Sequence, residues 1–250
     1  MDILKYVLLG IIQGFTEFLP VSSSGHLVVV QKILGISNGL VELEIILHLG
    51  TLAAVSVFLF KDIVKALTDK KSLFLIFIVT VITGIIGILG NDFFEGLFSS
   101  TKAVSLSLVF TGIILLATRN FLAGSRKVLN VKDAIILGVT QAIAIIPGVS
   151  RSGMTISTLL FRKVDKLTAF TFSFLVSMPV ILGAALFKAK DIGFVFKGQA
   201  INLIFGFAAS FLSGLLAISL LKKVLYKAKF YYFGYYCIIA AIAIFLFVKK

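Results

Sequence analysis

The sequence predicts an all-α polytopic membrane protein, with six transmembrane helices and two re-entrant helix-loop-helix segments arranged as an inverted internal repeat. Three observations favour this fold. Hydrophobic residues make up 59% of the chain, and several nearly uncharged stretches exceed the roughly 18 residues of a membrane-spanning helix. Two further apolar regions are each interrupted by proline, serine and glycine. No stretch is polar enough for a separate soluble domain, so residues 1–250 are expected to form a single membrane domain.

Six uninterrupted apolar stretches are expected to cross the bilayer. They cover residues 42–60, 73–90, 101–118, 167–187, 201–221 and 230–248. The two interrupted regions, residues 3–34 and 131–161, are interpreted as re-entrant. Non-helical backbone is tolerated at membrane depth only where protein or a water-filled cavity satisfies its polar groups. Each break is therefore expected to be a loop within a helix-loop-helix segment.

The two interrupted regions are related by an internal repeat. At a constant shift of 128 residues, the matching pairs are Leu9 and Leu137, Gly10 and Gly138, Gln13 and Gln141, Ser22 and Ser150, Ser24 and Ser152, and Gly25 and Gly153. The repeat halves are about 1–118 and 119–250. Broken helices at corresponding positions of two halves point to a site at the repeat interface, where helix N-termini can face an anion. The two loops are therefore expected to meet near mid-membrane.

The basic residues predict the topology. Fifteen Lys and Arg fall in the loops on one side and eight on the other, and the richer side is expected to be cytoplasmic. The repeats are then inverted: the first loop enters from outside, the second enters from the cytoplasm, and both termini lie outside. The net charge of +13 is explained by these short loops, which set topology and meet anionic lipid. Nucleic-acid binding is not expected.

The first interrupted region brings a carboxylate, hydroxyls and an imidazole together. Gln13 and Glu17 are four residues apart and share a helix face. Pro20 ends this helix because its nitrogen cannot donate a backbone hydrogen bond, and the serines and Gly25 that follow allow a new helix to begin near His26. The residues expected to face the turn are Gln13, Glu17, Ser22, Ser23, Ser24 and His26.

Each of these residues also has a structural explanation. Burial can hold Glu17 as a neutral acid, and His26 or the serines can serve close helix packing. The functional interpretation of Glu17 is favoured because ionisable groups within membranes are mostly functional. His48 has no such polar neighbours and is expected to be a packing or interface residue, and Glu42 and Glu44 begin a span and are expected to be solvated.

The second interrupted region carries Arg151 in a very apolar part of the chain. An intramembrane arginine must face a cavity or a partner rather than lipid. Its guanidinium matches phosphate oxygens bidentately, and neighbouring hydroxyls can add donors to the same anion. The residues expected to bind phosphate with it are Gly148, Ser150, Ser152 and Thr155. A structural ion pair between Arg151 and Glu17 is the main competing account, and it would also place the two loops in contact.

These motifs carry a family resemblance. The chain resembles the undecaprenyl-diphosphatase family of integral-membrane bacitracin-resistance phosphatases. Residues 13–17, Gln-Gly-Phe-Thr-Glu, are similar to the family's glutamate-rich motif, and residues 20–26 are similar to its serine-histidine segment. The family's Pro-Gly-x-Ser-Arg-Ser-x-x-Thr motif matches residues 147–155 throughout. Gln13 stands where an acid is more usual, which puts a metal-ligand role at that position in doubt.

The resemblance implies hydrolysis of undecaprenyl diphosphate to undecaprenyl phosphate and inorganic phosphate, which recycles the lipid carrier of cell-wall synthesis. Arg151 would hold the terminal phosphoryl group, and Glu17 would act as base or bind a divalent cation, Mg²⁺ or Ca²⁺. Ser23 or His26 would be the nucleophile or its activator. The sequence leaves three routes open: a phosphoserine intermediate, a phosphohistidine intermediate, or direct attack by metal-activated water.

The strongest alternative is a transporter or flippase of a phosphorylated prenyl lipid, because inverted repeats with broken helices are a transporter architecture. The combination of Glu17, Ser23 and His26 favours an enzyme, since binding alone does not need it. A purely structural bundle or small-ion channel explains neither the repeated serines nor Arg151. The expected location is the bacterial cytoplasmic membrane, with the site opening to the outer side. Small residues at Gly206 to Gly214 could serve an internal contact or a homodimer.

Overall fold

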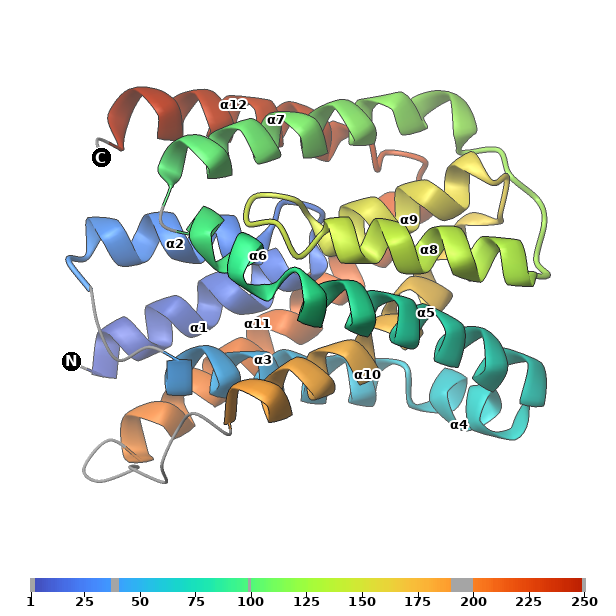
Figure 1. Cartoon of the computed structure of the whole chain (residues 1–250), viewed down its shortest axis with the longest axis horizontal. Coiled ribbons are helices and arrows are strands. Elements are labelled where there is room, and N and C mark those ends of the chain that lie inside the picture. Colours follow the sequence, from blue (N-terminus) through green and yellow to red (C-terminus); the bar gives the residue numbers. More distant parts are fainter. Residues whose placement is uncertain (1–2, 37–40, 99, 190–199, 249–250) are drawn as a thin grey trace.

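The computed structural model describes residues 3–36, 41–98, 100–189 and 200–248, and these residues form an all-α fold. Most of their longer helices run roughly along the long axis of the molecule (Figure 1). The elements are α1 (Ile3–Phe18), α2 (Ser23–Ile33), α3 (Val41–Phe58), α4 (Phe60–Thr68), α5 (Lys70–Leu89), α6 (Asn91–Phe98), α7 (Thr101–Ala117), η1 (Thr118–Phe121), α8 (Val131–Ile143), α9 (Arg151–Phe161), α10 (Lys166–Ala189), α11 (Ala200–Tyr226) and α12 (Tyr232–Phe247). The all-α prediction is confirmed.

Every predicted span corresponds to a helix, but the helices differ in length. Within the described part of the chain, four are long and apolar enough to cross a membrane alone: α5, α7 with η1, α10 and α11. Helices α3 and α4 would make a fifth span, bent by 78° at their junction, and α12, at 16 residues, is shorter. The protein is therefore a multi-span membrane protein, whereas a count of six spans stays a prediction.

The two interrupted regions form helical hairpins that point toward each other. Helices α1 and α2 extend from the end of the molecule where α1 begins, and α8 and α9 extend from the opposite end (Figure 1). Their loops meet in the middle of the molecule. Helix α12 ends on the same side as the start of α1 (Figure 1). This is the arrangement expected of an inverted repeat.

The repeat halves interlock rather than pack as separate bundles. The first hairpin's α1 packs mainly on α11 of the second half, and the second hairpin's α8 packs on α5 of the first half. Glycines permit the close approach: a Cβ added at Gly10 would lie 2.9 Å from Ala209 Cβ and would overlap the carbonyl oxygen of Gly206. The small residues of α11 that could have formed a dimer face are therefore used in an internal contact.

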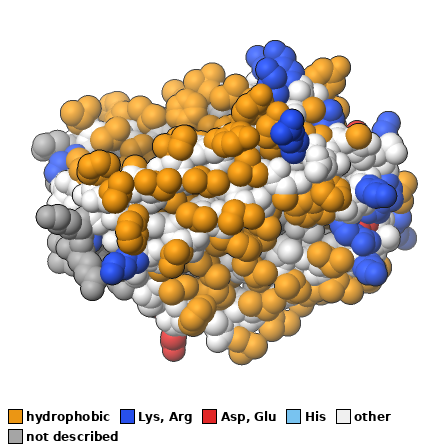
Figure 2. Space-filling model, turned by 90° about the horizontal axis from the view of Figure 1, so that it is seen from above, with side chains coloured by type: hydrophobic (Ala, Val, Ile, Leu, Met, Phe, Trp, Pro, Cys, Tyr) orange, Lys and Arg blue, Asp and Glu red, His pale blue; other side chains and the backbone are white. Residues whose placement is uncertain are grey.

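The outer surface is suited to lipid. Figure 2 shows hydrophobic side chains over the middle of the molecule, with most of the visible Lys and Arg toward one end of the long axis. That end carries α4 and the start of α8 (Figure 1), where the sequence places the positively charged loops. Large exposed apolar side chains include Phe74, Phe77, Ile204, Leu216 and Phe245. Such a band is expected to face the acyl chains of a bilayer.

A buried ionic cluster joins the two helices of the second hairpin at the end away from its loop. Asp133, at the start of α8, is 1% exposed. It accepts hydrogen bonds from Arg126 at 2.6 and 2.9 Å and from Arg162 Nε, just after α9, at 2.8 Å. It also forms a capping box with Asn130. One carboxylate thus ties together the start of α8, the end of α9 and the loop that precedes them.

Replacing Asp133 with Asn is expected to lower the free energy of unfolding by about 3 kcal/mol, because two arginines would lose the counter-charge between them. Thermal unfolding of the purified protein in detergent measures the change. Asp69→Asn is the matched control, since Asp69 also caps a helix, α5, but from an exposed position. Equal shifts in the two variants would show that the buried ionic cluster adds no stability beyond helix capping.

Candidate functional site

The first hairpin loop is stabilised by hydrogen bonds to Ser22, a residue with a strained backbone conformation. Helix α1 ends at Phe18, and the Oγ of Ser22 accepts a hydrogen bond from the Gly25 amide at 3.3 Å to begin α2. Ser22 has a φ of +68°, a region that residues other than glycine rarely adopt. Its carbonyl oxygen accepts from the His26 amide at 3.2 Å and from His26 Nδ1 at 2.9 Å. These bonds stabilise the turn that presents Ser23.

The second loop begins its helix in the same way, one repeat later. Ser150 Oγ accepts from the Gly153 amide at 3.1 Å, so Arg151 is the first residue of α9. Thr111 of α7 anchors the loop: it donates to the Gly148 carbonyl at 3.0 Å and accepts from the Ser150 amide at 3.1 Å. Gly148 has a φ of +93°, and a Cβ there would overlap the backbone of α7. Only glycine fits this position without strain.

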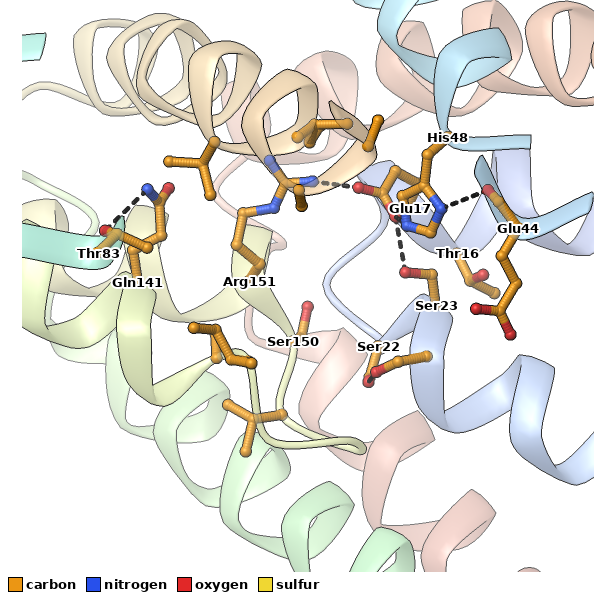
Figure 3. Close-up of a pocket in the computed structure, with 18 of the residues that line it drawn as sticks. Thr16, Glu17, Ser22, Ser23, Glu44, His48, Thr83, Gln141, Ser150 and Arg151 are labelled. Atoms are coloured by element: carbon orange, nitrogen blue, oxygen red, sulfur yellow. Dashed lines mark hydrogen bonds and ion pairs between the residues drawn. The ribbon is translucent and has the colours of Figure 1, made fainter. Parts of the chain in front are cut away.

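The two loops meet at the carboxylate of Glu17. Arg151 Nη2 donates to Glu17 Oε1, and Ser23 Oγ donates to Glu17 Oε2 at 2.6 Å (Figure 3). Gln13 Nε2 donates to the same Oε2 at 3.0 Å. His48 Nε2 lies 3.8 Å from Oε2. The ion pair that the sequence offered as an alternative is thus present, and it joins the two loops at the same point as the serine hydroxyl.

A cavity of about 210 Å³ opens beside this cluster. Glu17 and Arg151 line it in the middle of the molecule, and Glu44 and Lys188 line it where α3 begins and α10 ends (Figures 1 and 3). Its other polar lining residues are Thr16, Ser22, Ser23, Ser24, His48, Thr83, Gln141 and Ser150. Polar groups thus converge on a space large enough for a small anionic group.

Arg151, which lines this cavity, has one guanidinium nitrogen without a hydrogen-bond partner in the described part of the chain. Nη2 is occupied by Glu17, whereas Nη1 is buried and has no hydrogen-bond partner among the described residues. A buried donor without a partner costs about 1–3 kcal/mol, or more when it is charged. An anion that reached Nη1 would remove this cost. Arg151 therefore binds Glu17 through Nη2, and it keeps an unpaired donor at Nη1 while the residue lines the cavity.

The remaining predicted site residues fall into two groups. Ser22, Ser24 and Ser150 line the cavity with Ser23, Glu17 and Arg151. Gln13, Gly148, Ser152 and Thr155 do not line it: they hold the residues that do. Thr155 Oγ donates to the Arg151 carbonyl at 2.8 Å, and Ser152 Oγ donates to the Leu19 carbonyl at 3.3 Å, across the two loops.

His26 is placed outside the cavity lining. Because its Nδ1 donates to the Ser22 carbonyl, its Nε2 is free to accept, and it accepts from the Tyr236 hydroxyl at 2.7 Å. The two rings also stack, with centroids 5.8 Å apart. Both ring nitrogens are thus engaged away from Glu17. A role for His26 in the reaction stays a prediction.

Several cavity residues were missed from the sequence. His48 was expected to pack and Glu44 to be solvated, yet both line the cavity; the side chain of Glu42 lies outside the described residues. Glu44 and His48 are four residues apart on α3, and this spacing could have indicated that they share a helix face. Gln141 was noted only as the repeat partner of Gln13, and its Oε1 is buried without a hydrogen-bond partner. Thr83 and Lys188 gave no local signal, because the fold alone brings them to the site.

A resident divalent cation does not fit the donors around Glu17. Both carboxylate oxygens already accept hydrogen bonds, and one of them faces the positive charge of Arg151. In the described segments there is no group of three or more His, Cys, Asp or Glu that could hold a metal ion. Hard cations prefer several oxygen ligands. The described side chains around Glu17 therefore do not by themselves form a set of cation ligands.

The fold and this site define the class of the protein: a multi-span membrane protein with a polar-lined cavity between two opposed helical hairpins. The comparisons with known sequences give the family. The chain belongs to the family described as bacitracin resistance protein BacA, whose sequence model matches residues 6–243.

The relatives of this chain are similar over nearly their whole length. It is 42% identical to an undecaprenyl-diphosphatase of Halothermothrix orenii over 252 residues, which cover 98% of this chain and 97% of that protein. It is also 42% identical to an undecaprenyl-diphosphatase of Alkaliphilus metalliredigens, with 94% and 95% covered. An undecaprenyl-diphosphatase from Methanobrevibacter smithii is 37% identical, with 98% of each chain covered. The family resemblance predicted from the motifs is confirmed.

Proposed function

We propose that this protein hydrolyses undecaprenyl diphosphate to undecaprenyl phosphate and inorganic phosphate, and so recycles the lipid carrier of cell-wall synthesis. One observation carries the proposal: Arg151, whose buried Nη1 lacks a hydrogen-bond partner within the described segments, lines the same cavity as Ser23 and Glu17. A cation that can bind a phosphate, a hydroxyl and a base for that hydroxyl are the groups that phosphoryl transfer needs. The relatives carry the name of this activity.

The first chemical step transfers the terminal phosphoryl group to Ser23. Arg151 binds its oxygens and neutralises charge that develops on them. Ser23 Oγ, 2.6 Å from Glu17 Oε2, attacks the phosphorus and gives its proton to Glu17. The bond to the bridging oxygen breaks, and undecaprenyl phosphate leaves with the electron pair. Water then attacks the phosphoserine, Ser23 is released, and inorganic phosphate leaves.

The contacts favour Ser23 over His26 as the nucleophile. The hydroxyl of Ser23 already has a base, because it donates to a carboxylate at hydrogen-bonding distance. The ring of His26 bonds to Tyr236 and to the Ser22 carbonyl. A phosphohistidine would require this ring to break both bonds and turn toward the cavity.

The proposed setting is the bacterial cytoplasmic membrane, with the cavity open to the outer side. Two observations support this orientation. The cavity reaches Glu44 and Lys188 near the end of the molecule where α1 begins and α12 ends, and the basic loops gather at the opposite end (Figures 1 and 2). The positive-inside rule places the basic end in the cytoplasm. The prenyl tail would lie along the apolar outer surface while the diphosphate enters the cavity.

A divalent cation, Mg²⁺ or Ca²⁺, remains part of the proposal as a companion of the substrate. Hard cations bind phosphate oxygens readily, and Mg²⁺ is often held by substrate phosphates with few protein ligands. None of the steps above passes through it. Chelation is expected to reduce phosphate release without lowering the melting temperature of the substrate-free protein. A large drop in melting temperature on chelation would instead indicate a resident structural ion.

The alternative function is transport of a phosphorylated prenyl lipid, which the opposed hairpins favour. Phosphate release from undecaprenyl diphosphate by the purified protein in detergent separates the two functions. We expect multiple turnovers of phosphate per protein. Binding of the lipid by folded protein with no phosphate released would rule out the enzyme and favour transport.

A further inference from the structure

The second histidine of the chain, His48, lies beside the Glu17 carboxylate, to which Ser23 and Arg151 also bond. Its Nδ1 lies 2.8 Å from the Glu44 carbonyl oxygen, one turn earlier in α3. A carbonyl oxygen can only accept, so Nδ1 carries the proton and Nε2 of the neutral ring has a free lone pair. That nitrogen lies 3.8 Å from Glu17 Oε2, the oxygen that accepts the hydrogen bond from the Ser23 hydroxyl. The helix backbone therefore fixes the imidazole with its basic nitrogen toward Glu17.

We infer that His48 is the proton-exchange residue of this site: it takes the proton that Glu17 receives from Ser23 and passes it to solvent between the two half-reactions. This inference rests on the proposed function. Glu17 needs such a partner because its side chain is only 3% exposed and three donors surround it. The His48 side chain is 34% exposed and lines the same cavity, so it reaches both the carboxylate and solvent.

Other ionisable groups near the cluster are less suited to this role. The guanidinium of Arg151 has only donors and no atom that can accept a proton from Glu17. Glu44 is turned toward Lys188, whose Nζ lies 3.6 Å from Oε2, and toward Gln31 at 3.3 Å. His26 is bonded to Tyr236. Among the described residues, His48 alone combines a free basic nitrogen, closeness to Glu17 and access to solvent.

The proton balance of the cycle shows at which point His48 would act. In the first step Ser23 loses its proton to Glu17, the new Oγ–P bond forms, and undecaprenyl phosphate leaves as an anion. Glu17 then gives that proton to His48 Nε2, and solvent or buffer removes it. In the second step the ionised Glu17 takes a proton from the attacking water, the P–Oγ bond breaks, and the same proton returns to Ser23 Oγ. One proton per cycle leaves through His48.

Removing the imidazole should therefore stall the enzyme after the first step. His48→Ala and His48→Gln are each expected to slow phosphate release roughly 100-fold, the scale of general acid-base catalysis. Phosphate transferred to Ser23 from substrate labelled in its terminal phosphate should accumulate. Imidazole added to a dilute, bulky buffer should restore turnover, because imidazole is small enough to enter the cavity. The glutamine variant keeps a polar side chain of similar length and guards against misfolding.

His26→Gln is the matched control, since these are the only two histidines of the chain. Its turnover should not respond to added imidazole. The inference is overturned if His48→Gln turns over as fast as the unchanged protein, or if folded His48 variants are slow but imidazole restores neither. Equal restoration of His26→Gln would also overturn it. Absence of phosphate release from the unchanged protein would refute the proposed function itself, so the two failures are distinguishable.

Discussion

Arg151→Lys is expected to lower phosphate release about 1,000-fold, within the range seen when a charge-stabilising arginine is removed from phosphoryl-transfer sites. The guanidinium would serve two partners at once: Nη2 binds Glu17, and the buried Nη1, which has no partner among the described residues, would bind the phosphate. A lysine ammonium is a single point charge and cannot hold a carboxylate and a phosphate in one fixed fork. The variant would bind one partner at the expense of the other.

The control for this variant lies on the same helix. Arg162 follows the last residue of α9, at the other end from Arg151, and its Nε bonds Asp133. Arg162→Lys changes the same chemical group outside the cavity and should lose less than about 10-fold, an effect on stability rather than on chemistry. Steady-state phosphate release at saturating lipid separates the two variants. Comparable losses would show that Arg151 acts only as a structural ion pair between the loops.

Much of the site could be predicted from the sequence because its chemistry is local. Proline, serine and glycine break two apolar regions at positions 128 residues apart, and the structure confirms both breaks as loops. The capping serines, Ser22 and Ser150, occupy equivalent positions in that repeat. An arginine and a glutamate in apolar surroundings require partners, and each is the other's partner. Local rules were sufficient for these features.

The features that were missed depend on tertiary structure. The interlocking of the halves, with α1 on α11 and α8 on α5, cannot be inferred from helices considered one at a time. His48 has mostly apolar neighbours in sequence, so its local pattern indicates packing. Its four-residue spacing from Glu44 marks a shared helix face, but the position of α3 beside the first loop is what brings the ring to Glu17. The reverse holds for His26, whose serine-rich neighbourhood suggested chemistry although its ring bonds Tyr236 from α12.

Ser23→Ala is expected to reduce phosphate release by at least about 1,000-fold, because nucleophile and base act as one unit and the loss of either removes most of the catalysis. Glu17 would keep Arg151 and Gln13 as partners, so the loops should stay joined. Binding of undecaprenyl diphosphate by the folded variant should persist. Label from the terminal phosphate should be absent from the protein.

Ser24→Ala is the matched control for the nucleophile. Ser24 lines the same cavity, but its hydroxyl is not bonded to Glu17. Its Oγ lies 3.3 Å from the Oγ of Ser22. This variant should form the labelled phosphoserine, with a loss of about 10-fold in turnover from weaker phosphate binding. Label that persists in Ser23→Ala and disappears in His26→Ala would identify the histidine as the nucleophile. Multiple turnovers by Ser23→Ala with no label on any residue would instead require direct attack by water, and Glu17 would then be the base for that water.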